Sequence, residues 1–333
     1  MPFSSTLFHP ERYHGHRRRP PFFEGWYFKL IDASETHRYA VIPGIFLSKD
    51  PDRHHAFVQI LDGSTGNATY HRYPADEFRA ATDRFEVEIG PNRFSEQEMF
   101  LDIADGSRVA RGRVRLGESV PWPVTLTRLG IMGPYGWAPR MECNHGLVSF
   151  DHSLDGNLAV DGREIDFTGG RGYTEKDWGK AFPAGYVWMQ TNHFETPGTS
   201  FVASIAIIPW MVSAFPGFII GLRHKGKLHQ FATYSRATTT DLRFTDETVE
   251  WTVVDRRHRL RIRAERAQGG LLYAPTRREM SDRVGETMLS RVEVTLTDAQ
   301  GRVLFEEVGR NAGLELHGDL DRLLALQIEE AVR

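Results

Sequence analysis

Residues 173–178 of the chain read Tyr-Thr-Glu-Lys-Asp-Trp, which places two acids, one base and two aromatic residues within six positions. Glycine and proline punctuate the wider segment, residues 172–183, too often for a plain helix. On an extended strand Glu175 and Asp177 would project to the same side, whereas a loop allows no such assignment. One carboxyl could be held by a salt bridge while the other stays available for proton transfer, although structural ion pairs have the same pattern.

A second acid lies among aromatic residues near the N-terminus, in residues 22–29 with the sequence Phe-Phe-Glu-Gly-Trp-Tyr-Phe-Lys. On a strand, Glu24, Trp26 and Phe28 share one face. Because a carboxyl among aromatic rings loses the hydration of its charged form, we expect the pKa of Glu24 to rise toward neutrality, so that the group can hold and deliver a proton. The alternative is that the rings form a hydrophobic core and that Glu24 pairs with an Arg or Lys.

An aromatic segment that carries two amides follows in residues 185–194. Its alternation predicts a strand on which Trp188, Gln190, Asn192 and Phe194 project to one face. An aromatic face with two amides is typical of a pocket for a large, mostly apolar ligand with a polar head.

Alternation of apolar and polar residues with a period of two dominates the rest of the chain. It is clearest in residues 85–89, 259–265 and 291–296, which we interpret as half-buried strands with one hydrated face. Between the strands lie turn signals, which are Asp-Gly at 62–63, 105–106, 155–156 and 161–162 and Lys-Gly at 225–226. The sequence therefore predicts an all-β fold built from antiparallel strands.

A helical pattern occurs at the C-terminal end of the chain. Apolar residues follow Asp319 at helix spacing, namely Leu320, Leu323, Leu324, Ile328 and Ala331. We expect this short helix to pack on a sheet and to take no part in chemistry.

The domain organisation follows from the length and from a weak internal similarity. A chain of 333 residues suits two domains or one large β unit. Similar aromatic strands open at residues 25–28 and 185–188, which suggests two consecutive antiparallel β-barrel or sandwich units. Closed barrels would also leave no exposed strand edges. We place the boundary within residues 170–185 and predict domains at residues 1–175 and 176–333.

Composition excludes several classes of function. A net charge of -3 gives no overall attraction to nucleic acid. The single cysteine, Cys143, allows no intramolecular disulfide and no zinc framework, and the histidines lack metal-site spacing. Motifs for phosphate loops, dinucleotide binding and serine nucleophiles are also missing from the sequence. We expect a cytoplasmic protein without a signal peptide, a metal or a cofactor.

Two segments raise the question of contact with a membrane. The basic residues 14–21 are interpreted as a solvated lead into the first strand, with lipid head groups or an acidic partner as the alternative. The apolar run 205–222 is broken by prolines and is shorter than a clean membrane span, so it predicts two buried strands around a turn. Within it, residues 208–212 are the candidates for peripheral contact with a bilayer, although a buried strand end would explain them equally well.

The first two segments together resemble the tocopherol cyclase family. Residues 24–28 match the family's acid followed by Gly-Trp-Tyr-Phe, and residues 173–183 match its Tyr-x-Glu-Lys-Asn-Trp-Gly signature and the Phe-Pro that follows. The aromatic strand with Gln and Asn is matched at residues 188–194, and a further similarity covers residues 221–227. One departure is Asp177, which stands where the family usually has Asn. More distantly, the chain is similar to carotenoid hydratases and pericyclase-like proteins made of two lipocalin-like units.

The resemblance implies a fold, a reaction and a set of residues. The fold would be two consecutive lipocalin-like antiparallel β units followed by a short helix. The reaction would be closure of a chromanol ring on a prenylated quinol, in which an acid protonates an alkene and the phenolic oxygen captures the resulting cation. The catalytic candidates are Glu175 as proton donor, Glu24 as second choice and Asp177. The candidates for substrate contact are Trp26, Tyr27, Tyr173, Lys176, Trp178, Trp188, Gln190 and Asn192.

Two other functions would use similar features. A hydratase of an isoprenoid alkene would use a similar acid but admit water. A carrier of a hydrophobic isoprenoid would need the apolar cavity without a poised carboxyl. In all three cases the partner is a hydrophobic small molecule.

Overall fold

The computed structural model describes residues 8–138, 141–210 and 213–332, with side chains as far as residue 328. The chain forms two compact units. Unit 1 consists of Met1–Phe182 and Leu271–Arg283, and unit 2 consists of Pro183–Gly270 and Val284–Arg333. The predicted boundary between residues 175 and 176 therefore falls within unit 1, inside the strand formed by Arg171–Gly179.

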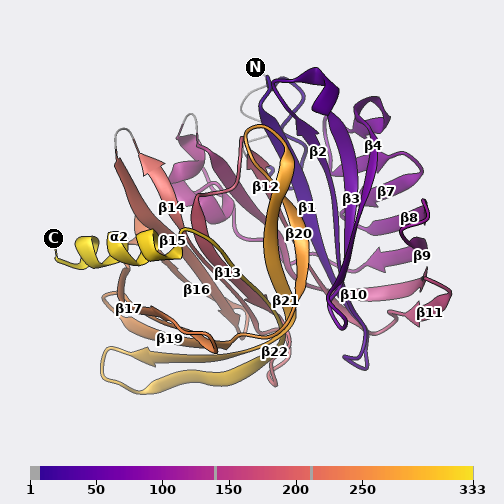
Figure 1. Cartoon of the computed structure of the whole chain (residues 1–333). Coiled ribbons are helices and arrows are strands. Elements are labelled where there is room, and N and C mark those ends of the chain that lie inside the picture. The colour runs from indigo at the N-terminus through magenta and orange to yellow at the C-terminus, as the bar shows by residue number, and fades with distance from the viewer. Residues whose placement is uncertain (1–7, 139–140, 211–212, 333) are drawn as a thin grey trace. The chain divides into compact units, whose positions relative to one another are not determined.

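Unit 1 contains the first of two antiparallel sheets (Figure 1). Its strands are β1 (Phe22–Ile31), β2 (Arg38–Leu47), β3 (His55–Asp62), β4 (Asn67–Pro74), β5 (Phe78–Ala80), β6 (Glu86–Ile89), β7 (Asn92–Ser95), β8 (Glu98–Ala104), β9 (Val109–Leu116), β10 (Cys143–Val160), β11 (Arg163–Asp166) and β12 (Arg171–Gly179). Short 3₁₀ turns occur at Pro51–Arg53, Ala75–Glu77 and Gly130–Trp137. The strand order is β4-β3-β2-β1-β12-β10-β9-β8-β7-β6-β5, and β11 pairs with β10.

One hydrophobic core fills the inside of unit 1. Trp26 and Phe28 of β1 share it with Val58 of β3 at one end of the sheet and with Val87 of β6 toward the other. Since strands from both ends of the sheet reach the same core, the sheet curls around it. The alternation of β1 and β12 thus decides which of their side chains enter the core and which lie on the opposite face.

Unit 2 contains the second sheet and the C-terminal helix. Its strands are β13 (Gly185–Thr191), β14 (Ser200–Trp210), β15 (Ser213–His224), β16 (Lys227–Ala232), β17 (Thr238–Phe244), β18 (Thr248–Val254), β19 (His258–Glu265), β20 (Gly270–Pro275), β21 (Met280–Asp298) and β22 (Val303–Gly318), with a 3₁₀ turn at Thr233–Ser235. The order is β16-β15-β14-β13-β22-β21-β19-β18-β17, and β20 pairs with β21. The segment Leu271–Arg283, which contains β20 apart from Gly270, the hairpin turn and the first four residues of β21, is grouped with unit 1 although it pairs with this sheet.

The two sheets repeat one topology. In each, four consecutive strands form a meander, β1 to β4 and β13 to β16, and the final strand of the unit, β12 or β22, pairs with the first strand of that meander. The aromatic strands whose similarity was noted in the sequence are β1 and β13, so they occupy equivalent places. The predicted all-β fold of two lipocalin-like units with a short terminal helix is confirmed.

The C-terminal helix α2 (Leu320–Val332) begins where the sequence predicts it. The Asp319 side chain accepts a hydrogen bond from the backbone N–H of Arg322 at 3.1 Å, as an N-cap residue does. Leu323 is fully buried against the core of unit 2, but Ile328 is 63% exposed. The packed face of the helix is therefore shorter than the apolar pattern suggested.

The predicted turn at Asp155-Gly156 is wrong, because both residues lie within the long strand β10. Gly156 has φ of 121°, and a Cβ atom there would lie 2.3 Å from the carbonyl oxygen of Arg113 on β9. The glycine thus serves close approach of a neighbouring strand and makes no turn. The signals at Asp161-Gly162 and Lys225-Gly226 do form tight turns, since all four residues have positive φ.

Gly112 on β9 makes the matching close approach to β10. A Cβ atom there would lie 2.3 Å from the carbonyl oxygen of Asn157, at φ of 142°. We expect Gly112→Ala to lower the free energy of unfolding of unit 1 by about 2 kcal/mol or more, because the backbone strain adds to an overpacked contact. Urea unfolding measures this, and Gly106→Ala is the control because it has positive φ but open space around the added Cβ. Equal losses in the two variants would contradict the steric argument.

The apolar run 205–222 forms the paired strands β14 and β15, as predicted. Ile207 and Phe218 are buried, whereas Trp210 at the end of β14 is 47% exposed. Met211 and Val212, part of the predicted bilayer contact, lie outside the described residues. Within the described ranges the model has no helix with the length and apolar character needed to cross a membrane.

Candidate active site

Strand β12 directs its chemical groups to two opposite faces of the sheet of unit 1. Lys176 points to the core side, where its ammonium lies 4.6 Å from the centre of the Trp26 ring. Tyr173, Glu175 and Asp177 alternate with it and lie on the other face. The predicted common facing of Glu175 and Asp177 is therefore found, but the lysine between them does not pair with either one.

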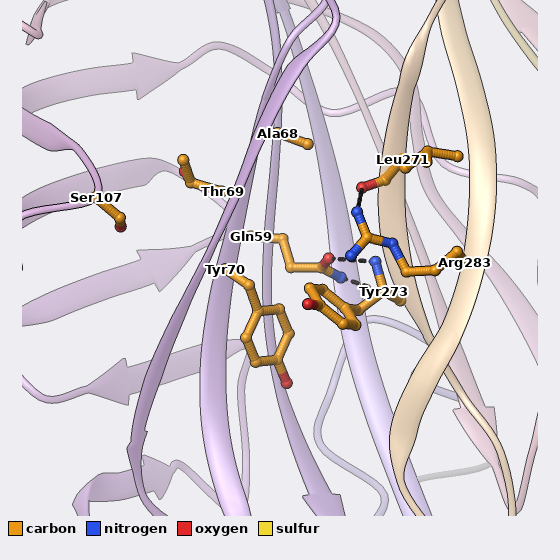
Figure 2. A pocket seen from close by; sticks show the side chains of 8 residues that line it. All are labelled: Gln59, Ala68, Thr69, Tyr70, Ser107, Leu271, Tyr273 and Arg283. Atoms are coloured by element: carbon orange, nitrogen blue, oxygen red, sulfur yellow. Dashed lines mark hydrogen bonds between the residues drawn. The ribbon is translucent and has the colours of Figure 1, made fainter.

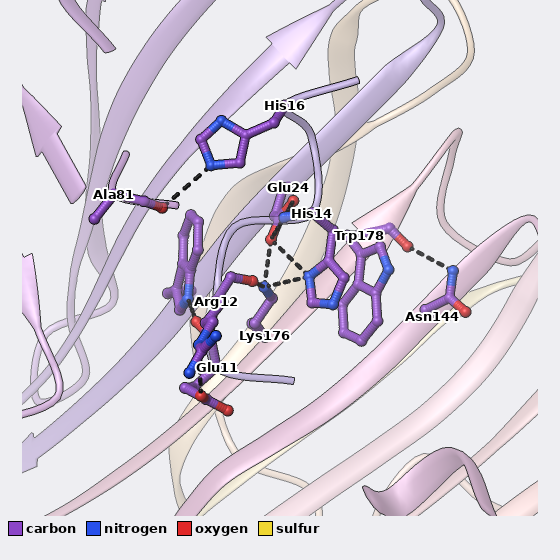
Figure 3. A network of polar contacts seen from close by, with 10 residues as sticks. Glu11, Arg12, His14, His16, Glu24, Ala81, Asn144, Lys176 and Trp178 are labelled. Carbon is purple, nitrogen blue, oxygen red and sulfur yellow. Dashed lines mark hydrogen bonds and ion pairs between the residues drawn. The ribbon is translucent and has the colours of Figure 1, made fainter. Parts of the chain in front are cut away.

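Glu24 and Lys176 form a fully buried ion pair on the core side (Figure 3). The two strands bring them together, since Trp26 is opposite Lys176 and Glu24 is opposite Trp178 in the register of β1 and β12. The Glu24 carboxylate also accepts hydrogen bonds from the backbone N–H of His14 at 2.9 and 3.0 Å. The structure therefore confirms the alternative prediction that Glu24 pairs with a basic residue.

The pKa of Glu24 is lowered, contrary to the expectation of a raised one. Burial by itself would raise the pKa of this carboxyl, but the nearby charge of Lys176 and the hydrogen bonds from His14 and Lys176 outweigh that effect. A carboxyl held ionised in this way is a poor reservoir for a proton. Glu24 therefore suits an ion pair better than it suits an acid catalyst.

The same network ties the N-terminal segment to the end of the core. The Trp26 indole N–H donates to the carbonyl oxygen of Glu11 at 3.0 Å, and the Lys176 ammonium donates to that of Arg12 at 2.5 Å. The His14 ring stacks on Trp178 with centroids 4.2 Å apart. The prediction that residues 14–21 are a solvated lead is thus wrong for His14, whose side chain is only 6% exposed, and holds for the exposed residues 16–20.

A second cluster lies on the opposite face, around Glu175. The Tyr173 hydroxyl donates a hydrogen bond to Oε2 of Glu175. His145 of β10 lies between the two acids of β12, with Nε2 at 3.4 Å from Oε2 of Glu175 and Nδ1 at 3.0 Å from Oδ1 of Asp177. His145 is opposite Asp177 in the strand register, which places its ring over this face. We call these four residues, Tyr173, Glu175, Asp177 and His145, the outer-face cluster.

The outer-face cluster holds protons at neutral pH. Burial alone would lower the pKa of His145, but the carboxylates of Glu175 and Asp177 raise it to about 9. Burial and the adjacent Glu175 also raise the pKa of Tyr173 well above its ordinary value, so its hydroxyl stays a donor. A buried carboxyl, an imidazolium and a phenol in direct contact form an arrangement suited to proton transfer.

The donor atoms of His145, Glu175 and Asp177 lie within 4.8 Å of one another, a compactness that raises the question of a metal ion. The imidazole ring, however, lies between the two carboxylates, and each of them faces a different ring nitrogen. One ion bound at either nitrogen would lie on the far side of the ring from one of the acids. The arrangement therefore fits proton transfer better than shared coordination, and we assign no metal.

The remaining predicted contacts of unit 1 lie on the same two faces. Tyr27 is opposite Glu175 across β1 and β12, so it belongs to the outer face, and it is 9% exposed. Trp26 and Trp178 belong to the core side, where their rings flank the Lys176 ammonium at 4.6 and 4.9 Å. The eleven predicted site residues thus do not form a single group.

The predicted contacts of unit 2 lie on β13 and just after it. Trp188 and Gln190 are buried on the face opposite Val187 and Met189, which enter the core of unit 2. Asn192 follows the strand and contacts the His193 ring through Oδ1 at 2.9 Å. Contact of these side chains with a substrate stays a prediction.

Phe194 does not share the face of Trp188 and Gln190, and this part of the sequence prediction is wrong. β13 ends at Thr191, so the alternation no longer applies three residues later. Phe194 instead packs in the core of unit 2 with Val187 and Met189.

A pocket of about 280 Å³ lies elsewhere on unit 1 (Figure 2). Its lining residues are Gln59, Ala68, Thr69, Tyr70, Ser107, Leu271, Tyr273 and Arg283. The Gln59 amide bonds the backbone N–H of Tyr273 at 2.8 Å and its carbonyl oxygen at 2.9 Å, and the Arg283 guanidinium lies 4.1 Å from the centre of the Tyr273 ring. The pocket contains none of the predicted site residues.

His145 is the functional candidate that the sequence analysis did not select. It precedes Glu175 by thirty residues, and only the pairing of β10 with β12 brings it to the acids. From the sequence, the adjacent Asn-His pair at residues 144–145 could line a cavity or supply a hydrogen-bonded core histidine, and nothing in its spacing indicated that it would join the acids.

Comparison with known proteins gives one family and several similar folds. The family model described as tocopherol cyclase-like matches residues 144–318, more than half of the chain. This range contains the strands β12 and β13 and all four residues of the outer-face cluster. No curated protein matches the chain.

Solved structures with low sequence identity share the fold. A putative AttH protein from Nitrosomonas europaea is 14% identical, with a TM-score of 0.54, over 96% of this chain and 97% of that chain. CghA in complex with Sch210972 is 12% identical, with a TM-score of 0.54, over 90% of this chain and 89% of that chain. At these identities the likeness is one of fold alone.

Proposed function

The chain belongs to the tocopherol cyclase-like family, and we propose that it is an enzyme that closes a ring on a prenylated quinol or related isoprenoid by protonating an alkene. Glu175 is the proposed proton donor. The substrate is a hydrophobic small molecule with a phenolic head, and the reaction is an isomerisation that needs no cofactor.

The observation that carries the proposal is the outer-face cluster. Glu175 is 5% exposed and contacts both a phenol and an imidazole. Proton donation to an alkene creates a carbocation, which requires an acid, aromatic surroundings and little water. Burial of Glu175 beside the rings of Tyr173 and Tyr27 supports each of these requirements.

The proposed reaction balances without an external reagent. The Glu175 carboxyl proton adds to the less substituted alkene carbon and leaves a tertiary cation and a carboxylate. The phenolic oxygen then forms a C–O bond with the cation and releases its proton to the enzyme. One proton is given and one is received, so the product is an isomer of the substrate.

We assign the other acids supporting roles. Asp177 contacts Nδ1 of His145 and can fix the orientation of the ring. Glu24 lies in the ion pair with Lys176 on the opposite face of the sheet, so we propose that it stabilises the fold and takes no part in the reaction.

The function is tested by incubating the purified protein with a panel of prenylated quinols and analysing the products by chromatography and mass spectrometry. An isomeric product of unchanged mass and shifted retention is the expected result. A gain of one water would indicate the hydratase instead, and tight binding of unchanged ligand would indicate a carrier. Neither binding nor conversion of any quinol would exclude this substrate class.

We also propose that the end of the β14–β15 hairpin contacts the bilayer from which the substrate is collected. Trp210 is 47% exposed, and its ring lies edge-on to that of Phe215 with centroids 6.3 Å apart. Residues 204–222 carry no charged side chain. Exposed Trp on an uncharged segment is typical of residues that enter a membrane interface.

Removal of this indole should weaken binding to lipid. Burying half a Trp surface, roughly 100 Å², corresponds to about 2 kcal/mol, so we expect Trp210→Ala to reduce partitioning onto phosphatidylcholine–phosphatidylglycerol vesicles by about thirtyfold. Co-sedimentation measures the bound fraction. Trp137→Ala is the matched control, since Trp137 is 49% exposed on unit 1. Equal binding of the two variants would contradict the assignment.

A further inference from the structure

We propose that His145, oriented by Asp177, is the residue that supplies the proton to Glu175 in each turnover. The inference rests on the proposed function of Glu175 as the acid and extends it to a three-residue relay, Asp177–His145–Glu175. In this relay His145 is a catalytic acid and base toward Glu175, and Asp177 is a positioning residue.

Backbone register builds the relay. His145 and Asp177 are direct partners in the pairing of β10 with β12, and Glu175 lies two residues away on the same face of β12. Residues i and i+2 of a strand lie on the same side, so the His145 imidazole, which is opposite Asp177, can also reach Glu175. Its Nδ1 lies 3.0 Å from Asp177, and its Nε2 lies 3.4 Å from Glu175.

The two ring nitrogens have different roles. The shorter contact, between Nδ1 and the Asp177 carboxylate, fixes the ring orientation and keeps a proton on Nδ1. The longer one places Nε2 3.4 Å from Oε2 of Glu175 without a hydrogen bond, so Nε2 is buried and makes no hydrogen bond within the described residues. Contacts of this kind shorten when a proton is transferred, as general acid–base pairs do in the working complex.

The same Glu175 oxygen receives the Tyr173 hydroxyl. This hydrogen bond and the charge of the nearby imidazolium stabilise the carboxylate that remains once the alkene has taken the proton. Tyr173 cannot replace His145 as the proton source, because burial and Glu175 raise its pKa well above its ordinary value. The imidazolium is then the group that protonates Glu175.

Over one catalytic cycle the relay donates and accepts the same number of protons. At rest Glu175 is ionised beside the imidazolium of His145. When substrate binds, His145 passes its Nε2 proton to Glu175, which gives it to the alkene carbon. Formation of the C–O bond releases the phenolic proton, which neutral His145 accepts. The imidazolium form is regenerated, and no proton is gained or lost overall.

Other titratable groups on this face belong to the neighbouring strands. Tyr27 and Lys29 of β1 are opposite Glu175 and Tyr173, and the Cys143 thiol of β10 lies 3.9 Å from Oδ1 of Asp177. Burial raises the pKa of Cys143, so the thiol stays neutral and adds no charge to the relay. The acids that surround His145 raise its pKa to about 9, which keeps the relay loaded at neutral pH.

Kinetics of two variants test the relay. We expect His145→Gln to lower kcat by about 10²-fold or more, within the range of one lost acid–base group, with KM changed by less than about twofold. Added imidazole should restore part of the rate in this variant, which a merely structural role of His145 would not allow. Asp177→Asn should lower kcat less and should shift the alkaline limb of the pH profile to lower pH. His37→Gln, a partly exposed histidine of unit 1, is the control.

A titration without substrate separates this inference from the proposed function. The His145 imidazole, followed by NMR in the full-length protein, should titrate near pH 9 and should move toward its ordinary pKa in Glu175→Gln and in Asp177→Asn. If no quinol is converted but this coupling is found, the relay stands and the substrate class is wrong. A His145 that titrates at its ordinary pKa, or a His145→Gln variant with full turnover, would overturn the relay.

Discussion

Glu175→Gln is expected to lower turnover of the cyclised substrate by about 10²- to 10⁴-fold and to leave the fold intact. Glutamine has the same shape and keeps an oxygen that can accept the Tyr173 hydroxyl, but it cannot give a proton to an alkene. The loss should appear in kcat, because the proton is transferred in the transition state and the apolar contacts that bind the substrate are retained. Steady-state kinetics on the substrate found in the quinol panel measure it.

Two further variants sharpen this test. Glu118→Gln makes the same chemical change at an exposed position of unit 1 and should keep full activity. Glu175→Asp keeps an acid but withdraws it by one methylene from Tyr173 and His145, so it should retain more activity than Glu175→Gln. Full turnover in Glu175→Gln would remove the donor assignment, and the carrier or another acid would have to be considered.

The strand pattern that the sequence predicted is largely present, because alternation is a local property. Residues 86–89, 259–265 and 291–296 lie in strands with alternating burial, since one face of each packs on a core, and Phe85 is buried just before the first of them. The same local rule correctly placed Glu175 and Asp177 on one face. A glycine can either form a turn or allow close approach of a neighbouring strand, and the local sequence does not distinguish these two roles. Asp155-Gly156 was therefore predicted to be a turn although both residues lie inside the strand β10.

The partners of the acids could not be predicted, because they depend on strand order. Lys176 is a neighbour of Glu175 in the sequence, but its ammonium lies across the sheet from it and pairs with Glu24. His145 reaches Glu175 and Asp177 because β10 pairs with β12. The composition of a segment does not show which residues it will pack against, so an acid among aromatic residues can be either half of an ion pair or a proton donor. The expectation of a raised pKa for Glu24 was wrong because its partner, Lys176, lies on another strand.

Lys176→Met is expected to destabilise unit 1 by about 3–5 kcal/mol, the cost of leaving a buried charge without its partner. Both side chains of the Glu24–Lys176 pair are fully buried, so water cannot replace the lost contact. The variant also removes the hydrogen bond to Arg12 and the cation that lies between the Trp26 and Trp178 rings. Thermal and urea unfolding measure the loss, with Lys49→Met at an exposed position as the control.

The double variant Glu24→Gln/Lys176→Met distinguishes a structural pair from a catalytic one. If the cost of each single change comes from an orphaned charge, the double variant should be less destabilised than the sum of the two. The lowered pKa of Glu24 predicts a pH dependence as well. The carboxylate contributes stability above its unfolded pKa, and this contribution is lost as the pH falls through the folded pKa, so acid should destabilise the wild type more than Glu24→Gln. Additive losses, or a Lys176→Met variant of unchanged stability that has lost turnover, would return both residues to the reaction.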